Sequence, residues 1–196
     1  MEEKEMEYLD SYEASLLQEM LKLCTSLGKM DGTLLSSEDI DGKWKEFAPE
    51  YMMEAVKNIN SYPEFTIGCA AYIGMAIAKW WDEDWGRHHN AGLGSLLGKR
   101  GFDDMDDHIV TDILGYGLDS KEAQMLSGLL LSCSQLAMDR IRHENIEMQT
   151  TRAFHILART LRVMFRIGAA LQLAQMNYKF EKVRYVTPNR TNPFLS

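Results

Sequence analysis

Residues 65–78, FTIGCAAYIGMAIA, form the longest apolar run of this 196-residue chain. Only Thr66 is polar in this run of 14 residues, whereas a helix that crosses a bilayer needs about 20 apolar residues. The run therefore predicts a buried helix near 62–84, with Pro63 in its first turn. Small residues recur on one face of this helix, so that a second helix can approach it closely. These residues are Ala70, Gly74 and Ala78.

The rest of the chain also has the composition and the pattern of helices. Leucine outnumbers valine by 23 to five, and no proline lies between residues 64 and 187, which favours helix over strand. Apolar residues at helical spacing predict further helices at about 5–28, 37–60, 104–117, 120–146 and 150–178. Pro49 is expected to break or kink the segment at 37–60, and Asp119 or Ser120 to cap the segment at 120–146.

These segments predict one all-α domain over residues 1–196, a bundle of five to seven helices around the buried helix near 62–84. The helices at 120–146 and 150–178 are expected to pack as an antiparallel pair. Residues 86–102 hold five of the 14 glycines and predict a long, mobile connection. The tail at 179–196 has two prolines and a net charge of +3, and it either docks on the acidic first helix or stays flexible.

The overall composition limits what the protein binds. A formal net charge of −8 and a pI near 5.1 argue against a main role in holding nucleic acid or an anionic membrane. The acidic start MEEKEMEYLD has the pattern of neither a signal peptide nor a mitochondrial presequence, so we expect a soluble, cytoplasmic protein. Cys24, Cys69 and Cys133 each lie in an apolar run, which predicts buried thiols without a disulfide framework or a zinc site.

One face of the helix at 150–178 carries five cationic or titratable side chains. These residues, called here the Arg/His stripe, follow one another at spacings of three, four, three and four: Arg152, His155, Arg159, Arg162 and Arg166. Either acidic residues of neighbouring helices balance their charge, or the stripe binds an external anion. Guanidinium groups suit a phosphate or a carboxylate, so the ligand would be an anionic small molecule or an acidic partner protein.

An acidic run suggests a metal site as a second hypothesis. Asp104 and His108 lie four residues apart on one predicted helix face, with Asp107 beside them, and His88 could join them if the glycine-rich connection folds back. Oxygen and imidazole ligands of this kind suit a divalent cation such as Mg, Mn, Zn or Fe. The competing explanation is that aspartates in a first turn cap the helix and complement its dipole.

Two tryptophans form a third candidate surface. Trp81 and Trp85 are four residues apart and therefore share one helix face. Tryptophan is common where a surface needs both apolar contact and one hydrogen bond, so the pair is either an interaction surface or part of the core.

The leading functional hypothesis is a non-catalytic interaction or ligand-binding module that uses the Arg/His stripe and the tryptophans. The alternative is a divalent-metal-dependent hydrolase of a phosphorylated small molecule, with the acidic run as ligands and Arg159 and Arg162 holding the phosphate. As a third reading, the acidic start of one chain and the basic tail of another associate in a homo-oligomer.

Overall fold

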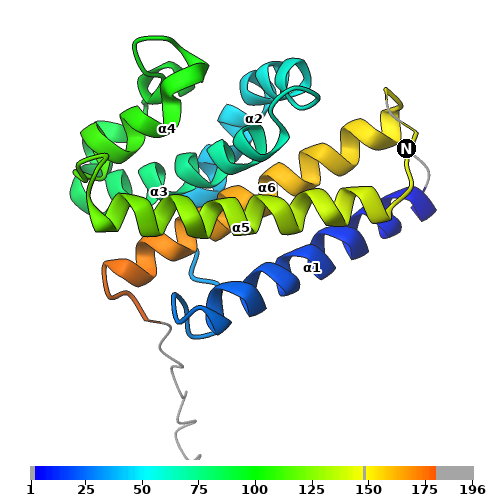
Figure 1. The fold of residues 1–196 in the computed structure, drawn as a ribbon, viewed down its shortest axis with the longest axis horizontal. Helices are drawn as coiled ribbons and strands as arrows, with labels where there is room; N and C mark the ends of the chain where they lie inside the picture. Colours follow the sequence, from blue (N-terminus) through cyan, green and yellow to red (C-terminus); the bar gives the residue numbers. More distant parts are fainter. Residues whose placement is uncertain (1–2, 148, 180–196) are drawn as a thin grey trace, which may run out of the picture.

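The computed structural model describes residues 3–147 and 149–179, and over these ranges the protein is a bundle of six α-helices without a β-strand (Figure 1). The helices are α1 (Glu3–Ser26), α2 (Glu38–Asn58), α3 (Pro63–His88), α4 (Met105–His108), α5 (Lys121–His143) and α6 (Thr151–Gln175). Three shorter turns, η1 (Leu93–Leu96), η2 (Phe102–Asp104) and η3 (Ile109–Ile113), lie between α3 and α5. The predicted all-α class is confirmed. Apart from Lys179, the predicted tail lies outside the described residues.

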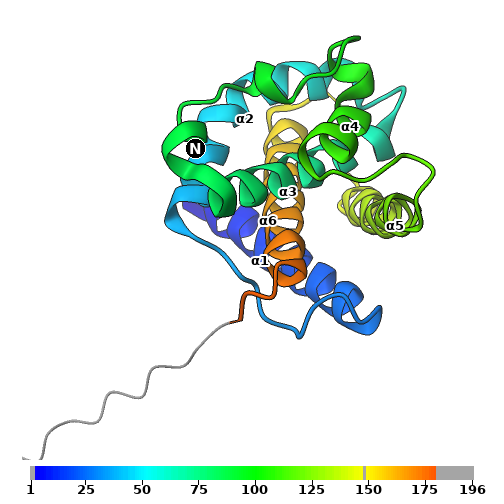
Figure 2. The ribbon, with the colours of Figure 1, turned by 90° about the vertical axis from the view of Figure 1, so that its left-hand side faces the viewer.

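Helix α3 lies at the centre of the bundle. Figure 2 shows α6 crossing it, with α1, α2 and α5 arranged around the crossing, and α3 contacts α2, α5 and α6. Every residue from 66 to 78 is buried, so the predicted central helix is confirmed. The hydroxyl of Thr66, the polar exception, donates a hydrogen bond to the carbonyl oxygen of Tyr62 (2.8 Å). No helix in the part of the chain that the structure describes is long and apolar enough to cross a membrane.

The small residues of α3 allow α6 to cross it at very short range. A Cβ atom built on Gly74 would lie 2.0 Å from the carbonyl oxygen of Phe165 in α6. One built on Gly168 of α6 would lie 1.9 Å from the carbonyl oxygen of Ala71 in α3. Both positions require glycine, because real Cβ atoms essentially never approach other atoms closer than 3.0 Å. The predicted close approach is thus present, and α6 is the helix that makes it.

Helix α2 continues through Pro49, so of the two expected outcomes, a break or a kink, the break is excluded. Pro49 is exposed, and so is Lys45, whose carbonyl loses its usual helical donor at a proline four residues later. That carbonyl oxygen can accept a hydrogen bond from solvent water instead. The opposite face of the helix is buried, and its residues Phe47 and Tyr51 hold the helix on the core.

The two long C-terminal helices begin at side-chain caps. Ser120 accepts a hydrogen bond from the backbone N–H of Ala123 (3.1 Å), and Thr150 accepts one from that of Ala153 (3.1 Å). Helices α5 and α6 contact each other, but α6 makes more of its contacts with α3 and with α1. The glycines at the crossing explain the many contacts with α3, because they let the backbones of α3 and α6 approach closely.

The glycine-rich connection leaves α3 after a break at Asp84, whose φ and ψ are −162° and 80°. Leu93 and Leu96 of η1 are buried and fasten this connection to the core. It therefore forms short turns that bring the acidic run at 103–107 back to the bundle.

Candidate binding groove

The arginines of the Arg/His stripe face acidic residues, mostly on α1. Arg152 pairs with Glu5 (3.1 Å), Arg159 with Asp10 (2.9 Å) and Glu13, Arg162 with Glu13 (3.3 Å), and Arg166 with Asp41 of α2 (3.9 Å). The remaining stripe residue, His155, is half-buried beside the ring of Phe154 (5.8 Å between centroids). The stripe thus joins α6 to α1, as the ion-paired alternative expects.

Glu13 is the centre of this network. Its side chain is 9% exposed, accepts a hydrogen bond from Arg159 and forms a second ion pair with Arg162. The side chain of Arg162 is 43% exposed, so the ion pair with Glu13 leaves much of it in contact with solvent. An exposed guanidinium of this kind can still bind an external anion while it holds its internal partner.

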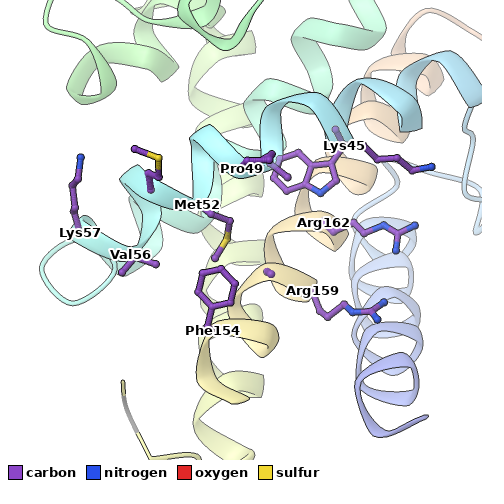
Figure 3. Close-up of a pocket in the computed structure, with 12 residues that line it drawn as sticks. Lys45, Pro49, Met52, Val56, Lys57, Phe154, Arg159 and Arg162 are labelled. Atoms are coloured by element: carbon purple, nitrogen blue, oxygen red, sulfur yellow. The ribbon is translucent and has the colours of Figure 1, made fainter. Parts of the chain in front are cut away.

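A groove runs beside these arginines, between α2 and the first half of α6 (Figure 3). Its volume is about 970 Å³. Eight apolar residues line it: Trp44, Ala48, Pro49, Met52, Met53, Val56, Phe154 and Ala158. The other four lining residues are Lys45, Lys57, Arg159 and Arg162, so every charged group in the lining is basic.

The apolar lining of the groove reaches the protein surface. Met53 is 63% exposed, Val56 48% and Phe154 46%. In Figure 3, Met52 lies above the ring of Phe154, Lys45 and Lys57 lie toward opposite ends of α2, and the two arginines extend toward α1. Exposed apolar surface with a polar rim is typical of a site that binds a partner or a ligand.

The residues predicted to hold a metal have other contacts in the structure. Asp104 accepts two hydrogen bonds from the backbone N–H of Arg100 (3.0 and 3.1 Å) and closes the turn before η2. His108 contacts Asp112 (2.7 Å), and the ring of His88 stacks on Trp80 with 4.9 Å between centroids.

Asp107 is exposed, and its backbone oxygen accepts from Thr111 (2.8 Å). Over residues 3–147 and 149–179, no three His, Cys, Asp or Glu side chains come together as a metal site would require. Metal binding and the hydrolase hypothesis stay predictions.

Both tryptophans of the third candidate surface are half-buried. The indole N–H of Trp81 donates to Asp39 of α2 (3.2 Å), and its ring lies 5.7 Å from that of Tyr178. Trp85 lies 6.5 Å from the ring of His89. Trp81 therefore helps hold α2 and the segment after α6 against α3.

Sequence reasoning did not identify the groove. One signal was present, since Met52 and Met53 are adjacent and cannot both point into the core from one helix face. The groove itself depends on how far α2 stands from α6, which no local pattern encodes. A comparison with known proteins adds no family to this picture, because no family model, curated protein or solved structure matches the chain.

Proposed function

We propose that the protein is a non-catalytic interaction module whose groove between α2 and α6 binds an amphipathic helix of a partner protein. The partner helix would place its apolar face on Met53, Val56 and Phe154, and acidic residues on its flanks would meet Lys45 and Arg162. The observation that carries this proposal is the combination of an exposed apolar floor with charged lining groups of one sign only.

The openness of the floor favours a protein segment over a small molecule. Small-molecule sites enclose about 70–90% of the ligand surface, whereas the floor of this groove includes side chains that are about half exposed or more. A helix that lies along two others covers such a surface with residues spaced three or four apart. The groove has helices on both sides, which suits that arrangement.

The charges of the lining groups decide the chemistry of the partner's flanks. Arg159 already forms ion pairs with Asp10 and Glu13. Lys45 is exposed and the side chain of Arg162 is 43% exposed, so both can contact a partner. Lys57 pairs with Glu54 on its own helix (2.7 Å), and such surface pairs contribute about 0–1 kcal/mol. A partner carboxylate can therefore replace Glu54 at little cost.

The test uses labelled helical peptides that share one apolar face and differ only in flank charge: acidic, neutral or basic. We expect fluorescence anisotropy to show the acidic peptide binding at least tenfold more tightly than the basic one. A tenfold difference corresponds to about 1.4 kcal/mol. Added salt should reduce this preference, since the lysines and Arg162 are solvent-accessible.

Two exposed methionines make a matched pair of variants. Met53→Glu places a carboxylate in the floor of the groove and should lower the affinity for the acidic peptide at least tenfold. Met125→Glu makes the same change at a 57% exposed position on α5, outside the groove lining, and should leave binding unchanged.

Three outcomes would overturn the proposal. The first is that no peptide binds, the second is that the basic peptide binds best, and the third is that Met125→Glu weakens binding as much as Met53→Glu. A different result would assign the groove to an anionic amphiphile instead. In that case no peptide binds, a fatty acid binds tightly, and Met53→Glu abolishes the binding of the fatty acid.

A further inference from the structure

Two cysteines that are far apart in the chain meet inside the bundle. The Sγ atom of Cys24, in the last full turn of α1, lies 3.9 Å from the Sγ atom of Cys133 in α5. Both residues are fully buried. The third cysteine, Cys69, is also buried but belongs to the central helix α3. The structure therefore contains one thiol pair and a separate thiol as an internal reference.

The two paired thiols differ in chemical character. The hydrogen bond between the two thiols lowers the pKa of Cys24 below its ordinary value, although burial opposes this. The same bond and burial raise the pKa of Cys133. Because the thiolate is the reactive form of cysteine, this difference favours Cys24 as the nucleophile of the pair and Cys133 as the resolving thiol.

The position of Cys24 also makes it the easier thiol to reach. It lies two residues before the end of α1, and Leu27, just beyond that end, is 49% exposed. The last turn of a helix opens at lower cost than its centre, so a small oxidant gains access to Cys24 by local fraying. Cys69 lies among the continuously buried residues 66–78 of α3 and has no such route.

We propose that Cys24 and Cys133 are a site of reversible oxidation, at which hydrogen peroxide converts the two thiols into an intramolecular disulfide. The thiolate of Cys24 attacks one peroxide oxygen, which breaks the O–O bond, releases hydroxide and leaves a sulfenic acid at Cys24. The sulfur of Cys133 then attacks the sulfur of Cys24 and expels the hydroxyl group as water. In total the two thiols lose two protons and two electrons, and peroxide becomes two molecules of water.

Disulfide formation requires a modest local movement. The sulfur atoms must close from 3.9 Å to about 2.05 Å, and the proposal requires side-chain rotation and a shift of the α1 terminus to supply this movement. The product would fasten the end of α1 to the middle of α5 across 109 residues of sequence. Thiol reductants would reverse it by exchange.

The experiment treats the folded, full-length protein with hydrogen peroxide, removes the oxidant with catalase, and then alkylates all remaining thiols under denaturing conditions. Intact mass spectrometry counts the labels. We expect three labels before oxidation and one after it, with the remaining label on Cys69 and a cross-linked peptide joining Cys24 to Cys133. Dithiothreitol should restore three labels. With increasing time in peroxide, Cys24 should become unavailable for alkylation at least tenfold faster than Cys69.

This count of alkylated thiols uses the unmodified protein, so it does not require any variant to fold. Retention of three labels at peroxide concentrations that oxidise free glutathione would overturn the proposal, as would loss of the Cys69 label first or a disulfide between two chains. Cys133→Ser adds a second readout, because it removes the resolving thiol. In that variant the oxidation of Cys24 should stop at the sulfenic acid, which reacts with dimedone. Absence of a dimedone adduct at Cys24 would also overturn the proposal.

Discussion

Replacing Gly168 by alanine tests the crossing of α3 and α6 on which the bundle is built. The new Cβ atom would lie 1.9 Å from the carbonyl oxygen of Ala71 and 2.6 Å from its carbonyl carbon. Real Cβ atoms essentially never lie within 3.0 Å of such atoms. In a close-packed interior the two helix backbones must therefore separate by more than about 1 Å.

The size of the effect follows from two opposing terms. Extra methylene groups in a packed core cost about 1–3 kcal/mol. Because the obstacle is a main-chain carbonyl of α3 that no rotamer change can move, we expect the upper end, about 3 kcal/mol. Alanine is about 1 kcal/mol better than glycine inside a helix. The free energy of unfolding should thus fall by about 2 kcal/mol, which lowers Tm by about 4–8 °C in a chain of this size.

Urea and thermal unfolding followed by circular dichroism measure this loss, and Gly128→Ala is the matched control. Gly128 is an exposed residue of α5, and a Cβ atom there meets nothing within 4 Å. The control should therefore gain about 0.5–1 kcal/mol from helix propensity alone. The same chemical change is expected to have opposite signs at the two positions.

A Gly168→Ala variant as stable as the unmodified protein, beside a stabilised Gly128→Ala, would refute the close crossing. Gly74→Ala should lose a similar amount, since its Cβ atom would meet the carbonyl oxygen of Phe165 at 2.0 Å. The double variant at 74 and 168 should lose less than the two losses added together, because one separation of the helices relieves both contacts.

Three further substitutions test other parts of the structure. Burial raises the pKa of Asp106, so the folded state holds this proton to higher pH than the unfolded chain does, and ionisation at neutral pH destabilises the fold. Asp106→Asn should therefore raise the urea midpoint at pH 7, and the gain should vanish as the pH falls below about 4; a constant difference across that range would contradict the assignment. Glu13→Gln leaves its two arginine partners short of a charge and should cost about 2 kcal/mol in urea unfolding, less than a fully buried pair because both arginines are partly exposed. Ser120→Ala removes the acceptor for the N–H of Ala123 and should cost about 1 kcal/mol; an unchanged Tm would show that the cap contributes nothing.

Much of the helical architecture could be predicted because its signals are local. The predicted segments 62–84, 120–146 and 150–178 correspond to α3, α5 and α6 to within a few residues, since apolar spacing and capping residues act within one or two helical turns. For Pro49 the local sequence left a break and a kink open, and the structure excludes the break. The effect of this proline depended on whether the affected carbonyl faces water or the core, and that is a property of the packed bundle.

The candidate sites were harder to predict, because side chains that are far apart in the chain define them. Spacing correctly placed the arginines on one face of α6, but Glu13 lies 146 residues before Arg159 and no local pattern connects them. The same limit applied to the thiols. Cys24 and Cys133 each read as an ordinary buried residue until the packing of α1 on α5 brought them into contact.

Local sequence was sufficient for the helical class, the buried central helix and the small-residue face that permits a close crossing. Hydrophobic periodicity and capping determine these features, because they depend on neighbours within a few residues along the chain. The packing of the bundle determined which helix occupies that face, which acids meet the arginines and where an apolar groove stays open. Those features depend on the spacing between helices, and that spacing is set by the fit of all the buried side chains together.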